Sequence, residues 1–222
     1  MPYSESPAAR CVSDAYRYCD EYLSLAYAGN QPGDRSIESI DMPGRLFYSR
    51  NHMWLNRADD GSCHIGIDAF LAKTLRQTDA IAYVTTRGTH NPTAVLTAHG
   101  VDFHVVFPAV LQIVRPNVYL RSDPARITSD PYRSGWLFET RELPGQQVEN
   151  SLLSGAKADA WMRRDIERLS SLAHDQVARL HPELAGDGGC FGGDLLEHLS
   201  REEQLALFQE YFSPYAGLED QP

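Results

Sequence analysis

Three residues that could do chemistry lie close together in residues 95–104, VLTAHGVDFH. His99, Asp102 and His104 are residue types that ligate divalent metals, and a neutral histidine can also act as a general base. No fourth ligand is recognisable nearby, and the chain contains no nucleophile motif of the GxSxG type. We therefore expect no enzymatic activity and no committed metal site. Binding of a metal or small ligand remains an alternative function.

The same stretch has the pattern of a β-hairpin. Gly100–Val101 would suit a two-residue turn of type II′, whose first central position requires a positive φ. That turn would pair His99 with Asp102 and Thr97 with His104, all on one face of the hairpin. The candidate binding residues of this hairpin are His99, Gly100, Asp102 and His104. The competing interpretation is a solvated polar face without a ligand.

Amines and thiols are sparse in this chain. Lysines occur only at Lys73 and Lys157, so any chemistry that needs a lysine has two candidates. The four cysteines form no CxxC pair, which is typical of reduced thiols in a cytoplasm rather than of a disulfide framework or a zinc ribbon. They are Cys11, Cys19, Cys63 and Cys190.

Composition and charge limit the partners. Hydrophobic residues make up 42% and charged residues 23% of the 222 residues, which is typical of a globular protein. The formal charge of −10 argues against binding to nucleic acid or to an anionic membrane surface. No apolar run is long enough to span a membrane, and the N-terminus has no export signal, so we expect a cytoplasmic protein.

The elements that must position these residues fall into three segments. Residues 1–44 predict a helical N-terminal segment, with apolar residues at helical spacing over 7–28. Residues 45–142 form a β-rich module with one short helix, and residues 150–222 predict a helical extension.

Two helix starts and one strand face are specific expectations. Asp68 is predicted to cap the short helix of the β-rich module, and Ser200 with Glu203 forms a capping box for a final helix. His52 and Trp54 are expected on one face of a strand, as packing residues. Residues 151–180 predict a long amphipathic helix with Trp161 on its apolar stripe, and the glycine-rich loop that follows is expected to be a connector.

Two ordered motifs mark the β-rich module. The first is FYSRNHMWL at residues 47–55, and the second runs from Asn117 through Ser122–Pro124 to SDPYRSGWLF at residues 129–138. In order and spacing they resemble the H-protein of the glycine cleavage system over about residues 46–140. The resemblance implies an α+β fold: a β-rich barrel-sandwich hybrid, here with helical N- and C-terminal extensions.

The resemblance also implies a place for chemistry. H-proteins carry lipoate on a lysine at a hairpin tip, and counting back from Pro108 places that position on Gly100. The acidic residue that precedes the lysine in the family is here Thr97. We therefore expect no lipoate and no other cofactor. The leading hypothesis is a non-lipoylated, non-enzymatic scaffold or regulatory partner of another protein, and a true lipoate carrier is a third alternative.

Overall fold

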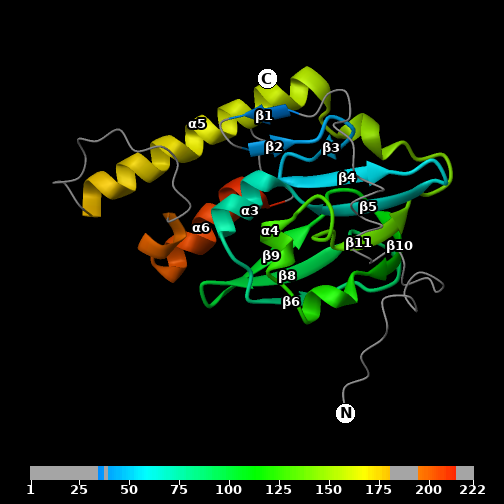
Figure 1. Ribbon diagram of the computed structural model, residues 1–222, viewed down its shortest axis with the longest axis horizontal. Coiled ribbons are helices and arrows are strands. Elements are labelled where there is room, and N and C mark those ends of the chain that lie inside the picture. Colours follow the sequence, from blue (N-terminus) through cyan, green and yellow to red (C-terminus); the bar gives the residue numbers. More distant parts are fainter. Residues whose placement is uncertain (1–34, 38–39, 181–194, 214–222) are drawn as a thin grey trace, which may run out of the picture.

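A computed structural model describes residues 35–37, 40–180 and 195–213 of the chain (Figure 1). No helix in these ranges is long and apolar enough to cross a membrane. The strands are β1 (Arg35–Ile37), β2 (Ile40–Met42), β3 (Phe47–Tyr48), β4 (Met53–Arg57), β5 (Ser62–Ile67), β6 (Ala80–Tyr83), β7 (Gly88–His90), β8 (Thr93–Ala98), β9 (Val101–Val106), β10 (Leu111–Pro116) and β11 (Phe138–Arg141). The helices are α3 (Ala69–Leu75), η2 (Val118–Arg121), α4 (Arg126–Ser129), η3 (Val148–Ser151), α5 (Gly155–Leu180), η4 (Leu195–His198) and α6 (Arg201–Phe212).

The strands form antiparallel sheets around one core. The largest has the order β3-β4-β5-β11-β10-β7, a second has the order β6-β8-β9, and β1 and β2 pair as a separate ribbon. Tyr83 of β6 meets Phe138 of β11 edge to face, with ring centroids 5.2 Å apart, which joins the two larger sheets. The α+β class is confirmed, but the sheets stay open, and the described residues contain no closed barrel.

The short helix forms where the sequence predicted it. The Asp68 carboxylate accepts a hydrogen bond from the Leu71 backbone N–H at 2.9 Å, so it satisfies one of the unpaired donors of the first turn of α3. Arg76 ends the helix with a positive φ of 63°, and its N–H donates to the Ala72 carbonyl. This helix begins directly after β5 and lies beside the end of the β8–β9 hairpin.

The helical extension packs on the β-rich module rather than standing apart from it. The predicted stripe of α5 is buried in the same core as the strands, at Ala158, Trp161, Met162, Ile166 and Leu169. Helix α6 begins with the predicted capping box at Ser200 and Glu203. Its Phe208 ring lies 4.7 Å from the Phe103 ring of β9, so α6 covers the hairpin strand that leads to the tip.

Several expectations lie outside the described residues. They are the N-terminal helix over 7–28, the cysteines Cys11, Cys19 and Cys190, and the glycine-rich loop that contains Cys190. Cys63 is the one predicted thiol within the described ranges, where it is buried and free.

Candidate functional site: a pinned hairpin tip and a buried histidine

The β8–β9 hairpin has a different turn from the one predicted. Ala98 pairs with Val101, so the two turn residues are His99 and Gly100, with φ values of 51° and 72°. Positive φ at both central positions defines a type I′ turn, whose twist matches that of the flanking strands. The predicted type II′ turn at Gly100–Val101 is therefore wrong.

The changed turn also changes the pairing. Asp102 lies opposite Thr97, and His104 lies opposite Val95, so each β9 residue pairs two positions earlier on β8 than predicted. A shift of two preserves the face on which each side chain lies. Asp102 and His104 are accordingly exposed on one face, where the Thr97 hydroxyl donates to the Asp102 carboxylate at 2.7 Å.

His99 does not join that face. Its Nε2 lies 3.0 Å from the Leu75 carbonyl oxygen, and because a carbonyl can only accept, this nitrogen carries the proton. The bond ties the hairpin tip to the C-terminal end of α3. The predicted pairing of His99 with Asp102 is thus wrong, and the hairpin does not bring His99, Asp102 and His104 together as a set of ligands.

No group of three histidine, cysteine or acidic side chains that could hold a metal occurs among residues 35–37, 40–180 and 195–213. The geometry therefore lends no support to the metal alternative. Gly100 is open to solvent, since a Cβ built on it meets no other atom within 4 Å. The tip has room for an attached group, but neither His99 nor Gly100 supplies the primary amine that an amide-linked lipoyl group requires.

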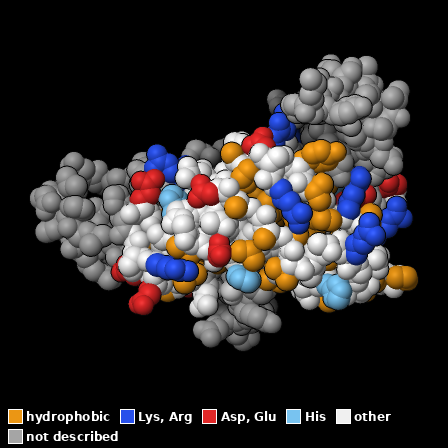
Figure 2. Space-filling view, turned by 90° about the horizontal axis from the view of Figure 1, so that it is seen from below, with side chains coloured by type: hydrophobic (Ala, Val, Ile, Leu, Met, Phe, Trp, Pro, Cys, Tyr) orange, Lys and Arg blue, Asp and Glu red, His pale blue; other side chains and the backbone are white. Residues whose placement is uncertain are grey.

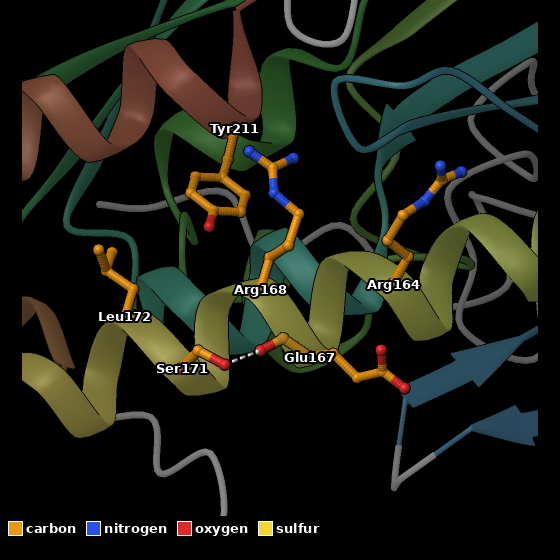
Figure 3. A pocket seen from close by; sticks show the side chains of 6 residues that line it. All are labelled: Arg164, Glu167, Arg168, Ser171, Leu172 and Tyr211. Atoms are coloured by element: carbon orange, nitrogen blue, oxygen red, sulfur yellow. Dashed lines mark hydrogen bonds between the residues drawn. The ribbon is translucent and has the colours of Figure 1, made fainter. Parts of the chain in front are cut away.

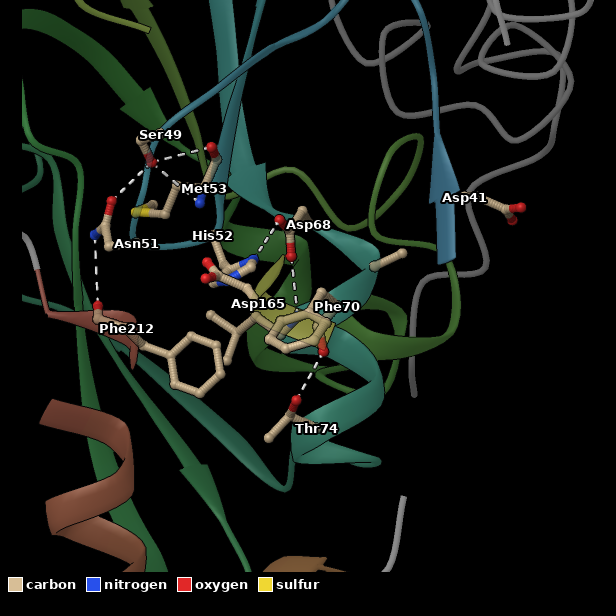
Figure 4. Close-up of polar contacts among 12 residues, drawn as sticks. Asp41, Ser49, Asn51, His52, Met53, Asp68, Phe70, Thr74, Asp165 and Phe212 are labelled. Carbon is tan, nitrogen blue, oxygen red and sulfur yellow. Dashed lines mark hydrogen bonds and ion pairs between the residues drawn. The ribbon is translucent and has the colours of Figure 1, made fainter. Parts of the chain in front are cut away.

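The most unusual polar cluster lies elsewhere, around His52 (Figure 4). His52 is fully buried, and its Nδ1 donates to the Asp68 carboxylate at 2.8 Å. On the other side of the ring, Nε2 lies 3.4 Å from a carboxylate oxygen of Asp165 in α5. This second contact is an ion pair, because Nε2 has no partner with hydrogen-bond geometry.

Two carboxylates keep this imidazole charged. Burial by itself lowers the pKa of His52, but the opposite charge of Asp68, the close polar contacts of the ring with Asp165 and Asp68, and the charge of Asp165 outweigh it and raise the pKa to about 9. His52 is therefore an imidazolium at neutral pH. A buried charge of this kind is tolerated only because both of its neighbours carry the opposite sign.

Aromatic rings close the cluster. The His52 ring stacks on Phe70 at 4.3 Å and lies 4.6 Å from Trp161 and 5.3 Å from Phe212. The neighbouring Asn51 amide donates to the Val106 carbonyl at 2.9 Å and to the Phe212 carbonyl at 3.5 Å. Through these contacts the β3–β4 turn holds α3, α5, α6 and β9 together, so the cluster anchors the helical extension.

The sequence prediction for His52 was partly wrong. His52 is a packing residue, but it lies in the turn before β4 with a positive φ of 59° and does not share a strand face with Trp54. Trp54 packs instead against Gly66, where an added Cβ would come within 2.8 Å of its ring. The available signal was Asp165, an acidic residue on the apolar stripe of α5, which indicates a buried cationic partner.

A shallow cavity of about 420 Å³ lies between α5 and α6 (Figure 3). Its lining residues are Arg164, Glu167, Arg168, Ser171, Leu172 and Tyr211. The Arg168 guanidinium lies 4.7 Å from the centre of the Tyr211 ring and pairs with Glu210 at 3.1 Å. Burial raises the pKa of Tyr211, with Arg168 opposing the shift, so the phenol stays neutral. These contacts clamp the two helices together.

Comparison with known proteins assigns the chain to a family. The profile of the family described as glycine cleavage H-protein matches residues 46–165, which is more than half of the chain. The chain belongs to this family. The match extends past the β-rich module into α5 and ends at Asp165, so the family region includes both carboxylates that pair with His52.

Individual relatives agree with the profile. The chain is 30% identical over 121 residues to a glycine cleavage system H protein from Enterobacter sp. (strain 638), covering 53% of this chain and 94% of the relative. It is 29% identical over 126 residues to one from Psychrobacter sp. (strain PRwf-1), covering 54% and 97%. A crystal structure of an H protein from Mycobacterium marinum aligns with a TM-score of 0.47 and 23% identity, covering 56% of this chain and 98% of that one.

Proposed function

We propose that this protein is a non-lipoylated member of the H-protein family that acts as a non-enzymatic scaffold or regulatory partner of another protein. The observation that carries the proposal is the hairpin tip. At the position where the family resemblance implies a lipoyl lysine, the turn consists of His99 and Gly100, and the His99 side chain is bonded to the Leu75 carbonyl. A tip without an amine, tied to α3, suits a fixed surface better than a swinging arm.

The loop that carries the family motif supports the second half of the proposal. The Asn117 amide donates to the Trp136 carbonyl at 2.9 Å and to the Ser134 carbonyl at 3.2 Å. At Gly135 an added Cβ would lie 2.6 Å from the Arg126 carbonyl oxygen, so only glycine fits there without a shift. These contacts fix the loop of the family motif, so the protein keeps a defined surface there although the tip lacks an amine.

The two lysines define the test. Lys73 lies in the last turn of α3, the helix whose Leu75 contacts the tip, and Lys157 lies in the first turns of α5. We expect neither to be acylated when the protein is produced with lipoate in cells that lipoylate their own proteins. Peptide mapping by mass spectrometry should find both unmodified. The H protein of the Enterobacter relative, produced in the same cells, serves as positive control.

A lipoyl or octanoyl group on either lysine would contradict the proposal and restore the lipoate-carrier alternative. A Gly100→Lys variant tests the position itself, because it returns an amine to the open tip at the cost of a side chain at positive φ, and lipoylation of this lysine would show that the missing amine is what prevents modification. The proposal also includes a cytoplasmic location and no binding to nucleic acid, as the cysteine pattern and the charge of −10 suggest.

A further inference from the structure

One end of the molecule carries exposed apolar side chains together with two exposed arginines. Val84 follows the last residue of β6 and is 59% exposed, while Val118 and Tyr119 open η2 and are 48% and 49% exposed. The two segments are adjacent, because the Tyr83 hydroxyl donates to the Asn117 carbonyl at 2.5 Å. We call Val84, Val118, Tyr119, Arg87 and Arg121 the β6–η2 patch.

The two arginines of the patch form no ion pair among the described residues, although Asp123, which pairs with Arg126, lies two positions after Arg121. Both Arg87 and Arg121 are exposed. Arg121 lies over the Tyr83 ring at 5.6 Å, which holds its charge at the patch. Figure 2 shows this side of the molecule, where hydrophobic side chains gather with Lys and Arg side chains around and between them.

The backbone that presents Val118 and Tyr119 is held by hydrogen bonds. Asn117 lies directly before η2, and its side-chain amide donates hydrogen bonds to the Ser134 and Trp136 carbonyls. Its own carbonyl accepts a hydrogen bond from the Tyr83 hydroxyl. Val118 and Tyr119 are therefore presented from a backbone that is already ordered, which lowers the entropy cost of an association. Exposed aromatic and arginine side chains on a fixed backbone have the composition of an interaction centre.

From these contacts we infer that the β6–η2 patch is the docking surface of this protein for a folded partner whose contact surface is apolar at its centre and acidic at its rim. The charge favours such a partner, since the patch is positive on a chain with a net charge of −10. The inference rests on the proposed scaffold function and names the surface and the partner chemistry. A membrane or a nucleic acid suits the patch less well, because the rest of the chain repels polyanions.

The first step of the test is a photo-crosslinking residue, benzoylphenylalanine, placed at Tyr119 in the full chain within its own cells. The same residue at Leu205, an exposed side chain of α6, is the matched control. The inference predicts a crosslink to one partner protein from position 119 and none from position 205.

The second step measures affinity of the purified crosslinked partner for the unlabelled protein. Tyr119→Ala and Arg121→Glu should each weaken binding by about tenfold or more, and binding should weaken as salt is raised. Arg163→Glu, a charge reversal at an exposed α5 arginine away from the patch, should leave the affinity unchanged. Far-ultraviolet circular dichroism of each variant verifies that it is folded.

The outcomes separate the surface from the function. The patch is overturned if the partner crosslinks only from position 205, or if Tyr119→Ala and Arg121→Glu leave its affinity unchanged. Either result leaves the scaffold function standing. Crosslinks from position 119 to a second copy of this chain, to lipid or to nucleic acid overturn the proposed partner chemistry. If neither position crosslinks to any protein, both the patch and the scaffold function are overturned.

Discussion

Two turns of this protein each place a histidine at a positive φ, yet they have opposite environments. His52, with φ of 59°, is fully buried between the carboxylates of Asp68 and Asp165. His99, with φ of 51°, lies at the hairpin tip and bonds to a single backbone carbonyl, that of Leu75. The first histidine joins four elements into one core, and the second stands at the place where the family resemblance implies chemistry.

The two histidines differ in how much of the fold depends on them. A buried imidazolium cannot be exchanged without leaving its carboxylates uncompensated, so the His52 cluster constrains every element that it touches. The tip has open space around Gly100, and a change there disturbs only one turn and one hydrogen bond. A fold can therefore retain its frame while the chemistry of its tip is replaced.

The largest expected effect comes from removing the buried charge. His52→Asn keeps a residue type that tolerates positive φ but leaves Asp68 and Asp165 without their counter-ion, and it should lower the free energy of unfolding by about 3 to 5 kcal/mol. His99→Asn at the tip is the matched control and should cost less than about 1 kcal/mol. Urea unfolding of both variants measures the contrast, and equal losses of stability would show that the buried charge of His52 matters no more than the hydrogen bond at the tip.

The pH dependence of stability should identify the same charge. Because folding raises the pKa of His52 to about 9, its stabilising contribution is complete below its ordinary pKa of 6.5 and is lost as the pH rises through about 9. The wild-type free energy of unfolding should fall by up to about 3 kcal/mol across that window. His52→Asn should lack this component. A wild-type curve that coincides with the variant's curve in shape would show that His52 is not charged in the fold.

The smallest expected effect concerns the exposed clamp between α5 and α6. Arg168 lies over Tyr211 and pairs with Glu210, but its side chain is 43% exposed, so solvent screens both contacts. Arg168→Met should cost less than about 1 kcal/mol in urea unfolding. A loss as large as that of His52→Asn would mean that the surface clamp, and not the buried cluster, anchors the extension.

The fold was largely predictable because its signals are local. Asp68 and Ser200 cap helices by contacts within three residues, and the stripe around Trp161 follows helical spacing. The motif ending at residue 138 gave the family, which the match over residues 46–165 confirms. The shared face of Thr97, Asp102 and His104 was also correct, because alternation fixes a face without fixing the pairing, whereas His99 lies in the turn and not on that face.

The site was less predictable because the turn type and the long-range contacts of His52 are not determined by the local sequence pattern. A type I′ turn at His99–Gly100 and a type II′ turn at Gly100–Val101 both place glycine at a positive φ, and they differ only in whether His99 adopts one too. The His52 cluster joins residues more than 100 positions apart, His52 and Asp165, so no spacing rule could find it. Only the acidic residue on the buried stripe of α5 pointed to it.

The mass of the protein isolated from its own cells shows whether it carries a lipoyl group and whether it is bound to a partner. The denatured mass reports any covalent group, and the native mass reports any retained partner. We predict a denatured mass equal to that of the unmodified chain and a native complex with a second protein. A denatured mass increased by a lipoyl or octanoyl group would contradict the account and make Lys73 or Lys157 the carrier residue.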